Sequence, residues 1–240
     1  MKKIVMVCPA DDDNWNKYGV NLLNSLRKFH SEEELPFIRV NNPIPKDTNW
    51  FYRATPILGE QFLKEYEIVV KIDCDSIVFG DISHIWNIDA DIGVVLNDFK
   101  YTIDVWDIGP RFGTPYFNNG LVVLKNKEFV NHWLRLCMSP HFDRYQFREQ
   151  DLLNVLCSDY FDYKVICLDA SDKIHGEYAK SLWPQAKLVE GKVIISSPTG
   201  GEDKQLMIVH FGGGNDPSKG NYRIRFQKPV VEFIDGLIKP

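Results

Sequence analysis

The chain has 240 residues, of which 44% are hydrophobic and 25% are charged, and its formal net charge is −5 at pH 7. This length and composition are typical of one globular domain or of two tightly joined ones. The acidic balance argues against general nucleic-acid binding, and no apolar run approaches the roughly 20 residues that a membrane-spanning helix needs. The five cysteines are widely spaced and odd in number, which favours buried free thiols and a cytoplasmic protein.

Hydrophobic periodicity predicts alternating strands and helices along the chain. In chain order we expect a strand at 3–8, a helix at 17–29, a strand at 37–40, a loop at 41–47, a helix at 54–64, strands at 68–72, 92–96 and 120–124, helices at 129–137 and 147–156, strands at 164–168, 192–196 and 207–211, and a helix at 230–238. This alternation predicts an α/β fold with a mixed, mainly parallel central sheet flanked by helices. The clustered late strands are expected to form a mixed edge.

Two carboxylates, Asp73 and Asp75, follow the apolar strand 68–72 directly. The same Asp-x-Asp spacing also occurs at 11/13 and at 89/91, so spacing alone is weak evidence. Position is more informative, because open α/β sheets bind ligands at the carboxyl ends of their parallel strands. A hard divalent cation there would satisfy both carboxylates and contact phosphate oxygens. The structural alternative is a pair that caps the turn before Phe79.

One enzyme class with this arrangement is the haloacid-dehalogenase-type phosphatases, which use Asp-x-Asp as nucleophile and acid/base. Asn215 and Asp216 could imitate their second acidic motif. In those enzymes the nucleophile strand usually opens the domain, whereas a complete strand–helix unit precedes it here. This class stays as an alternative.

Five segments together resemble a second class. They are VCPADDDNWNKYGVNLLNSL, FYRATPILGEQFLKEYEIVVKIDCDSIVFGDISHIW, YFNNGLVVLKNKEF, REQDLLNVL and IVHFGGG. In this order they resemble the retaining glycosyltransferases of family 8, the glycogenin and lipopolysaccharide galactosyltransferase group. That resemblance covers most of the chain and implies the GT-A fold, a UDP-sugar donor and a divalent metal, Mn²⁺ or else Mg²⁺.

The resemblance also implies a metal site. Asp73, Asp75 and His210 would be the ligands of a cation that stabilises the diphosphate leaving group. His210 opens a glycine-rich turn in which Gly213 would let the backbone approach phosphate. Lys219 would contact phosphate too, although it lies three positions beyond the family's lysine. A buried core histidine is the structural alternative for His210.

Further donor contacts follow from the opening segments. Asp12 would accept the uracil N3–H, and Trp15 would stack on the base, whereas a capped helix start is the alternative for this stretch. Arg53 would contact the donor or form a surface salt bridge. The remaining residues assigned to the donor by the resemblance are Ala10, Asn14, Cys74 and Asn118.

The triplet Glu149-Gln150-Asp151 would lie near the anomeric carbon and carry catalysis. In the family the first acidic residue binds sugar hydroxyls, and the glutamine lies opposite the leaving group. Retention of configuration is therefore expected, with His175 as the one candidate base for inversion.

The sequence thus predicts a single glycosyltransferase domain, with residues 1–125 binding the nucleotide-sugar and residues 126–240 completing the metal site and binding the acceptor. It would transfer a hexose from a UDP-sugar. The acceptor stays open among a glycan, a lipid-linked sugar and other molecules, and the oligomeric state stays open too. A non-catalytic scaffold that binds nucleotide or glycan is a further alternative.

Overall fold

The computed structural model describes residues 3–41, 50–97, 104–105, 109–110, 115–140, 142–158, 161–170, 172–176, 180–196, 202–211 and 222–240. All but the first residue of the loop predicted at 41–47 lies outside these ranges, as does the glycine-rich turn after His210.

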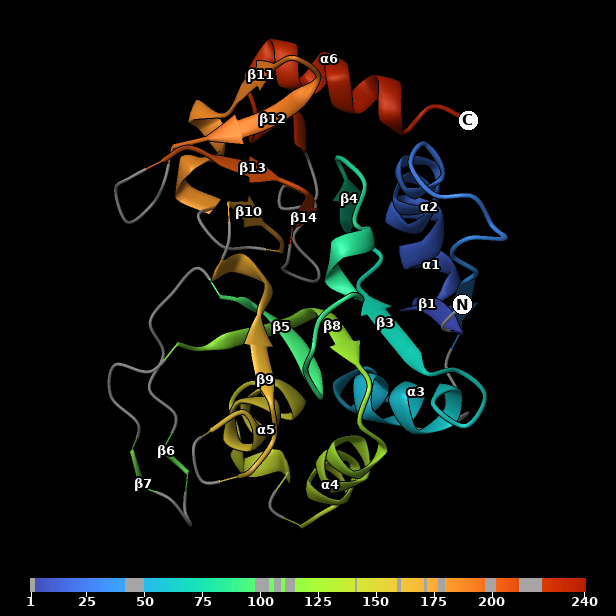
Figure 1. Ribbon diagram of the computed structural model, residues 1–240, viewed down its shortest axis with the longest axis vertical. Helices are drawn as coiled ribbons and strands as arrows, with labels where there is room; N and C mark the ends of the chain where they lie inside the picture. Colours follow the sequence, from blue (N-terminus) through green and yellow to red (C-terminus); the bar gives the residue numbers. More distant parts are fainter. Residues whose placement is uncertain are drawn as a thin grey trace.

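The centre of the molecule is a six-stranded, mainly parallel sheet (Figure 1). One strand, β8, is antiparallel to both of its neighbours, and the other pairings are parallel. From one edge to the other, the order is β2 (Phe37–Val40), β1 (Ile4–Pro9), β3 (Ile68–Ile72), β8 (Phe117–Leu124), β5 (Ile92–Leu96) and β9 (Val165–Cys167). The predicted α/β class and the mixed, mainly parallel sheet are confirmed.

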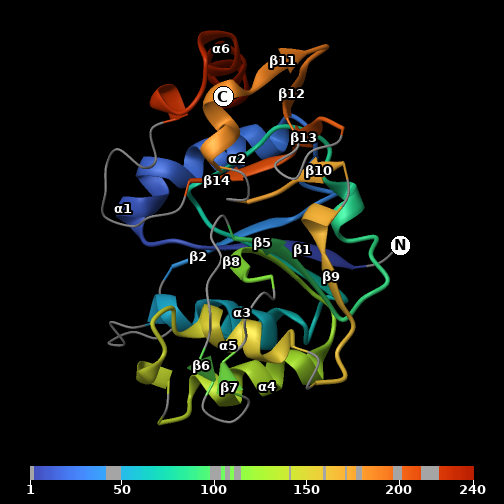
Figure 2. The same ribbon diagram turned by 90° about the vertical axis from the view of Figure 1, so that its left-hand side faces the viewer.

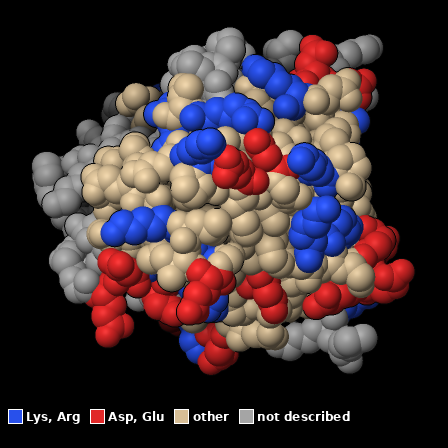
Figure 3. All heavy atoms as spheres, turned by 90° about the horizontal axis from the view of Figure 1, so that it is seen from above, with Lys and Arg blue, Asp and Glu red and all other residues tan. Residues whose placement is uncertain are grey.

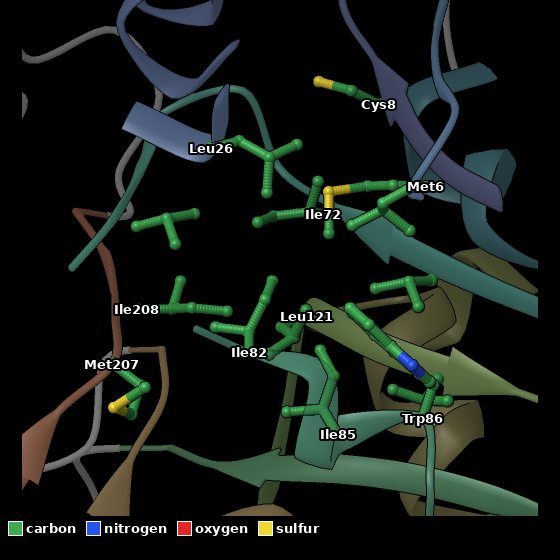
Figure 4. Packing of buried hydrophobic residues seen from close by; sticks show 14 of the residues in the cluster. Met6, Cys8, Leu26, Ile72, Ile82, Ile85, Trp86, Leu121, Met207 and Ile208 are labelled. Carbon is green, nitrogen blue, oxygen red and sulfur yellow. The ribbon is translucent and has the colours of Figure 1, made fainter. Parts of the chain in front are cut away.

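The inner strands are apolar on both faces because helices or a second sheet cover both sides. Successive side chains of a strand point to opposite faces. Met6 and Ile72 accordingly belong to one buried cluster (Figure 4), and Val7 and Val69 belong to another on the opposite face. The one charged side chain within β3 is Lys71, which is also buried.

Helices form the layers on the two faces of this sheet (Figure 2). One face is covered by α3 (Ala54–Phe62), α4 (Lys127–Cys137) and α5 (Glu149–Leu156). The other is covered by α2 (Val20–Arg27), which follows the short α1 (Asp12–Asn14) and a π-helical turn at Trp15–Gly19. The helix predicted at 17–29 therefore begins in that π-helical turn and ends two residues early.

Only the first of the clustered late strands, β9, forms an edge of the central sheet, whereas the strands predicted at 192–196 and 207–211 lie outside this sheet. Instead β10 (Lys173–Ile174), β13 (Lys204–Leu206), β12 (Lys192–Ile195) and β11 (Lys187–Val189) form a separate four-stranded sheet in that order. The physical reason is a third buried cluster, in which apolar residues of these strands pack against α6 (Lys228–Leu237) and Trp183. This unit lies at the upper end of Figure 1.

Two small ribbons complete the strand pairing. In the first, β4 (Ser76–Val78) pairs antiparallel with β14 (Ile208–His210). In the second, β6 (Asp104–Val105) pairs antiparallel with β7 (Gly109–Pro110). Single 3-10 turns occur at Trp50–Arg53, Ser83–Ile85, Phe142–Arg144, Leu168–Ala170, Lys180–Gln185 and Tyr222–Ile224.

The surface at the α6 end carries charges of both signs close together, as Figure 3 shows. All five cysteines are free thiols. Every helix in the described part of the chain is too short or too polar to span a lipid bilayer.

Candidate active site

A solvent-open cleft of about 500 Å³ lies at the carboxyl ends of β1 and β3. Open α/β sheets bind ligands at this end of their strands, and the volume is within the range of small-molecule sites. Segments far apart in the sequence form the walls: the end of β1, the residues after β3, the first half of β8 and the start of α5. The lining includes Asn14, Tyr18, Tyr52, Asp73, Asn119 and Gln150.

Three potential metal ligands meet beside the cleft. His210 Nε2 lies 3.1 Å from Asp75 Oδ1 and 3.4 Å from Asp73 Oδ2, and one ligand atom from each residue lies within 4.8 Å of the others. The β4–β14 ribbon creates this approach, because His210 is in register with Ser76 and the backbone N–H of Phe211 donates to the Asp75 carbonyl at 3.1 Å. The structure therefore brings together the three ligands that the resemblance implied.

Gly120 makes room for the His210 imidazole. A Cβ at residue 120 would lie only 2.3 Å from His210 Nδ1 and 2.7 Å from Asn118 Oδ1. The backbone of Gly120 also fixes its neighbours, since its carbonyl accepts from the N–H of Asp73 at 2.8 Å and its N–H donates to Asn118 Oδ1 at 2.6 Å. Two carboxylates and an imidazole, drawn together over a glycine, form a donor set that fits a divalent cation.

Lys71 is a buried cation beside these carboxylates. Its Nζ lies 2.6 Å from Asp73 Oδ1 and donates to the Asn119 carbonyl at 2.6 Å. Burial acts to raise the pKa of the Asp75 carboxyl, but the hydrogen-bonded His210 imidazole and Lys71 lower it more, so this pKa lies below its ordinary value. Asp75 is consequently ionised at neutral pH, as a metal ligand must be.

Glu149, the first residue of α5, is buried between β8 and α3. Its Oε1 accepts from Asn119 Nδ2 at 2.7 Å and from Thr55 Oγ1 at 3.3 Å, and its Oε2 accepts from the Thr55 N–H at 3.3 Å. Burial raises the pKa of Glu149 to about 8; Lys71 and Thr55 oppose this rise, and Asp73 adds to it. Glu149 therefore lines the cleft while it holds Asn119 and Thr55 in place.

Gln150 and Asp151 have different surroundings. Gln150 lines the cleft, where its Oε1 accepts from the Asn119 N–H at 3.1 Å and its Nε2 donates to the Tyr116 hydroxyl at 3.2 Å. Asp151 is 1% exposed, and its two oxygens accept from the Tyr116 hydroxyl and the Phe147 N–H, both at 2.7 Å. It fixes the turn before α5, so only the first two residues of the predicted triplet line the cleft. A role for Asp151 at the sugar stays a prediction.

At the β1 end of the cleft, the aromatic lining residue is Tyr18 rather than Trp15. The Trp15 ring packs 5.9 Å from the Phe37 ring, centroid to centroid. It folds back over its own helical turn, where a Cβ at Gly19 would lie 2.2 Å from the nearest carbon of the Trp15 ring. Base stacking by Trp15 therefore stays a prediction that this arrangement does not favour.

The residues around Trp15 mostly stabilise the start of α1. Asp11 is the N-cap, and its Oδ1 accepts from the Asn14 N–H at 2.7 Å. Asp12 forms an ion pair with Arg39 on the surface. Ala10 is fully buried. Of the residues predicted here, Asn14 alone is part of the cleft lining, and the capped helix start proposed as the alternative exists, with Asp11 as its cap.

The next two residues predicted to contact the donor, Cys74 and Arg53, lie in different surroundings. Cys74 lines the cleft. Arg53 lies at the end of α4, where its Nε donates to the Cys137 carbonyl at 3.1 Å and its guanidinium lies 4.5 Å from the Phe142 ring centroid. These contacts hold the half-buried side chain in place, and its contact with the donor stays a prediction.

Three more predicted contacts complete this comparison. Asn118 is buried, and its side-chain oxygen holds the backbone of Gly120. Gly213 and Lys219 lie outside the described residues, so their phosphate contacts stay predictions.

Sequence reasoning missed eight residues of the lining, and four of them have side chains that bear on binding, namely Tyr18, Tyr52, Lys71 and Asn119. Tyr18 and Tyr52 are aromatic residues in helical segments, and nothing in their spacing separates them from core residues. Asn119 replaces the family's alanine beside Asn118, which was a visible signal of a changed site. Lys71 also had a signal. It is a lone lysine in a buried strand, and because it precedes Asp73 by two residues, the two side chains point to the same face of the sheet.

Comparison with known proteins places this geometry in a known fold. No model of a protein family matches the chain, and its sequence matches no curated protein. Among solved structures, the galactosyltransferase LgtC, in complex with donor and acceptor sugar analogues, is 18% identical over 98% of this chain and 97% of its own, with a TM-score of 0.61. The bifunctional glycosyltransferase WbbM is 15% identical over 97% of this chain, with a TM-score of 0.60.

A third solved structure, a glycosyltransferase involved in glycosylation of the major capsid of PBCV-1, is 11% identical over 91% of this chain and 97% of its own, with a TM-score of 0.58. The chain spans 50% of the length of WbbM and 46% of the length of the glycosyltransferase GlyE from Streptococcus pneumoniae. These likenesses show that the chain has the GT-A fold of glycosyltransferases.

Proposed function

We propose that the chain is a metal-dependent glycosyltransferase that transfers a hexose from a UDP-sugar to a glycan or another acceptor, with retention of configuration. The observation that carries this proposal is the meeting of Asp73, Asp75 and His210 beside a cleft at the ligand-binding end of a glycosyltransferase fold.

Asp73, Asp75 and His210 would hold the cation, and the imidazole favours Mn²⁺ over Mg²⁺. When bound, the cation supplies Lewis-acid stabilisation of the diphosphate leaving group. The remaining chemistry belongs to the protein. Lys71 keeps a positive charge next to the leaving group, because it lines the same cleft as the two aspartates.

The transferred sugar would lie against the amides of Asn119 and Gln150. Both side chains are fixed before a donor binds, Asn119 by the Glu149 carboxyl and Gln150 by the Tyr116 hydroxyl and the backbone of β8. Pre-positioned amides can donate to sugar hydroxyls without a further loss of side-chain freedom. An active-site glutamine-to-glutamate mutant of LgtC has been solved, and Gln150 is the glutamine of this cleft that we assign to a corresponding place.

Retention is supported by the surroundings of Glu149 and His175, the two groups that could act as a general base in an inverting reaction. Both carboxylate oxygens of Glu149 accept hydrogen bonds from the protein. His175, the alternative base, is fully buried, and its ring nitrogens lie 3.0 Å from His84 Nε2 and 3.3 Å from Asp169 Oδ1. Neither group is free to activate an acceptor hydroxyl for inversion.

The phosphatase alternative is not favoured. Its nucleophile would be Asp73, whose oxygens face Lys71 and His210 in this structure. The residues that could supply its second acidic motif, Asn215 and Asp216, lie outside the described residues. The fold is that of glycosyltransferases.

The test is the release of UDP from a panel of UDP-hexoses, with Mn²⁺ and with a chelator. We expect release with Mn²⁺ only, and a loss of at least about a hundred-fold in Asp75→Asn, which removes one ligand charge. Asp89→Asn is the matched control, since the Asp89 side chain is 97% exposed and pairs with Lys164 on the surface, away from the cleft lining. Phosphate release from a simple phosphomonoester, without UDP release, would instead support the phosphatase.

Stereochemistry needs a separate measurement once an acceptor sugar is found. NMR of the product linkage should show an α-linked product from an α-linked donor. A β-linked product would overturn retention and leave the transfer itself in place.

A further inference from the structure

Lys71 is a charged residue that the expected metal chemistry does not require. It occupies the fourth position of β3, among Ile68, Val69, Val70 and Ile72, and is 2% exposed. A buried ammonium is unfavourable unless it is paired. Its partners are both in the site, namely Asp73 Oδ1 at 2.6 Å and the Asn119 carbonyl at 2.6 Å.

The position of Lys71 follows from strand geometry. Side chains two residues apart point to the same face of a strand, so the ammonium extends along the sheet toward the carboxylate that follows the strand. Asp73 Oδ1 therefore faces Lys71, and Asp73 Oδ2 faces His210. Only one of the two oxygens of Asp73 is directed to the ligand cluster.

The charges of the cluster make its attraction for a divalent cation different without and with a bound diphosphate. Asp73 and Asp75 supply two negative charges, and Lys71 cancels one of them before any cation arrives. A divalent cation without nucleotide would thus meet a net charge of about −1, and it would be repelled by an ammonium a few ångströms away. A diphosphate brings further negative charge and oxygen ligands, which restore the attraction.

We propose that Lys71 makes metal binding depend on the nucleoside diphosphate, so that the site retains a divalent cation well only when the diphosphate is also bound. This inference rests on the proposed function of the Asp73–Asp75–His210 cluster. Lys71 acts as a positioning residue for Asp73 and as a fixed counter-charge. A purely structural salt bridge would affect stability alone and would not set this dependence.

The experiment measures Mn²⁺ binding to the whole chain by the loss of the free-ion EPR signal, with and without UDP. For the unmodified protein we expect UDP to tighten Mn²⁺ binding by at least about ten-fold, and Mn²⁺ to tighten UDP binding by the same factor, because binding linkage is reciprocal. Equal Mn²⁺ affinity with and without UDP would overturn the proposal without any variant.

The variants then test the ammonium itself. In Lys71→Met, affinity for Mn²⁺ alone should rise by about ten-fold, since one nearby positive charge is lost, and the gain from UDP should shrink. Lys71→Arg should keep the original dependence. Lys64→Met is the matched control, because Lys64 is exposed and pairs with Glu60 on the surface of α3; it should change neither affinity.

The outcomes separate this inference from the proposed function. Should Lys71→Met fold, as judged by circular dichroism, yet bind Mn²⁺ alone no more tightly, the inference is wrong while the metal site stands. Absence of Mn²⁺ binding in every condition would remove the inference together with the metal-dependent function. If Lys71→Met fails to fold, Lys71→Gln removes the same charge and retains a donor for the Asn119 carbonyl.

Discussion

At the scale of single residues, the carboxyl of Glu149 is a strongly displaced titratable group of the cleft. Its pKa is raised from 4.5 to about 8, first by burial and further by Asp73. Between these values the folded state keeps a proton that the unfolded chain releases. The stability from this proton is fully present below about pH 4.5 and is lost as the pH rises to about 8, at up to about 1.4 kcal/mol per pH unit.

Replacing Glu149 with glutamine should remove that part of the pH dependence. We expect the free energy of unfolding of the unmodified protein to fall between pH 5 and pH 8, relative to that of Glu149→Gln. Denaturant unfolding of both proteins at pH 5, 6.5 and 8 measures the difference. Parallel dependence of the two proteins on pH would show that the carboxyl titrates normally in the folded state.

His210 carries the prediction about metal preference. Carboxylate oxygens alone suit Mg²⁺, whereas an added imidazole favours transition metals. In His210→Ala we expect most UDP release to be lost with either metal and the preference for Mn²⁺ to shrink in the remaining activity. His132→Ala is the control, because His132 lies on α4 and contacts Tyr163. Full activity of His210→Ala with an unchanged preference would make His210 a core residue.

Single residues also show where reading the sequence succeeds. Asp73, Asp75 and His210 meet as the resemblance implied, because each follows or ends a recognisable apolar strand. The direction of a side chain was harder to predict. Tyr18 lines the cleft, whereas Trp15 packs against Phe37. Which of the two rings faces the cleft depends on a π-helical turn, and that turn has no clear sequence signal.

At the scale of elements, the site depends on close contact between β8 and the β4–β14 ribbon. Gly120 permits this contact, because the imidazole of His210 occupies the space that a Cβ would take. Gly120→Ala should displace His210 and lower Mn²⁺ affinity in the presence of UDP by about ten-fold or more, as mutations of groups that position a metal ligand do. Isothermal titration calorimetry measures this affinity.

A second glycine provides the matched control. Gly236 lies in α6 with open space where a Cβ would be added. Gly236→Ala should stabilise the protein by about 0.5–1 kcal/mol through helix propensity and leave Mn²⁺ affinity unchanged. Equal metal affinity in Gly120→Ala and Gly236→Ala would mean that His210 is not held by this contact.

The elements differ in how well the sequence predicted them. The bounds of β2, β3 and β5 agree with the predicted strands, because stretches of four or five mostly apolar residues give a clear pattern. By contrast, β4, β10, β11 and β13 have two or three residues each, which is too short for a period to be seen. Three of them, β4, β10 and β13, contribute buried residues to the cluster around α6 and Trp183, so long-range packing determines where they lie.

At the scale of the whole molecule, the cleft joins the two predicted halves of the chain. The half before residue 126 supplies Asp73 and Asp75, and the later half supplies His210, Glu149 and Gln150. The later half also carries the four-stranded sheet, whose buried cluster includes Ile77 and Phe79 of the first half. A ligand that contacts both halves would therefore oppose their separation, and its binding should appear in the stability of the whole chain.

That expectation leads to a test that needs no acceptor. A ligand at 100 times its dissociation constant adds about 2.7 kcal/mol to folding, which raises the melting temperature of a chain of this size by roughly 5–10 °C. We expect UDP with Mn²⁺ to give a shift of this order, and GDP or CMP with Mn²⁺ to give a smaller one. Differential scanning fluorimetry of the unmodified chain measures all three.

Two aromatic variants test where the uracil base binds, because each should change the melting temperature in a different way. Tyr18 lines the cleft and Trp15 packs against Phe37, so Tyr18→Ala should reduce the shift produced by UDP while changing the ligand-free melting temperature little. Trp15→Ala should instead lower the ligand-free melting temperature, because it removes a large ring from the packing between the π-helical turn and β2. If Trp15→Ala alone reduces the UDP shift, the ring must turn into the cleft when nucleotide binds. An equal shift with GDP would refute uracil recognition at this end of the cleft.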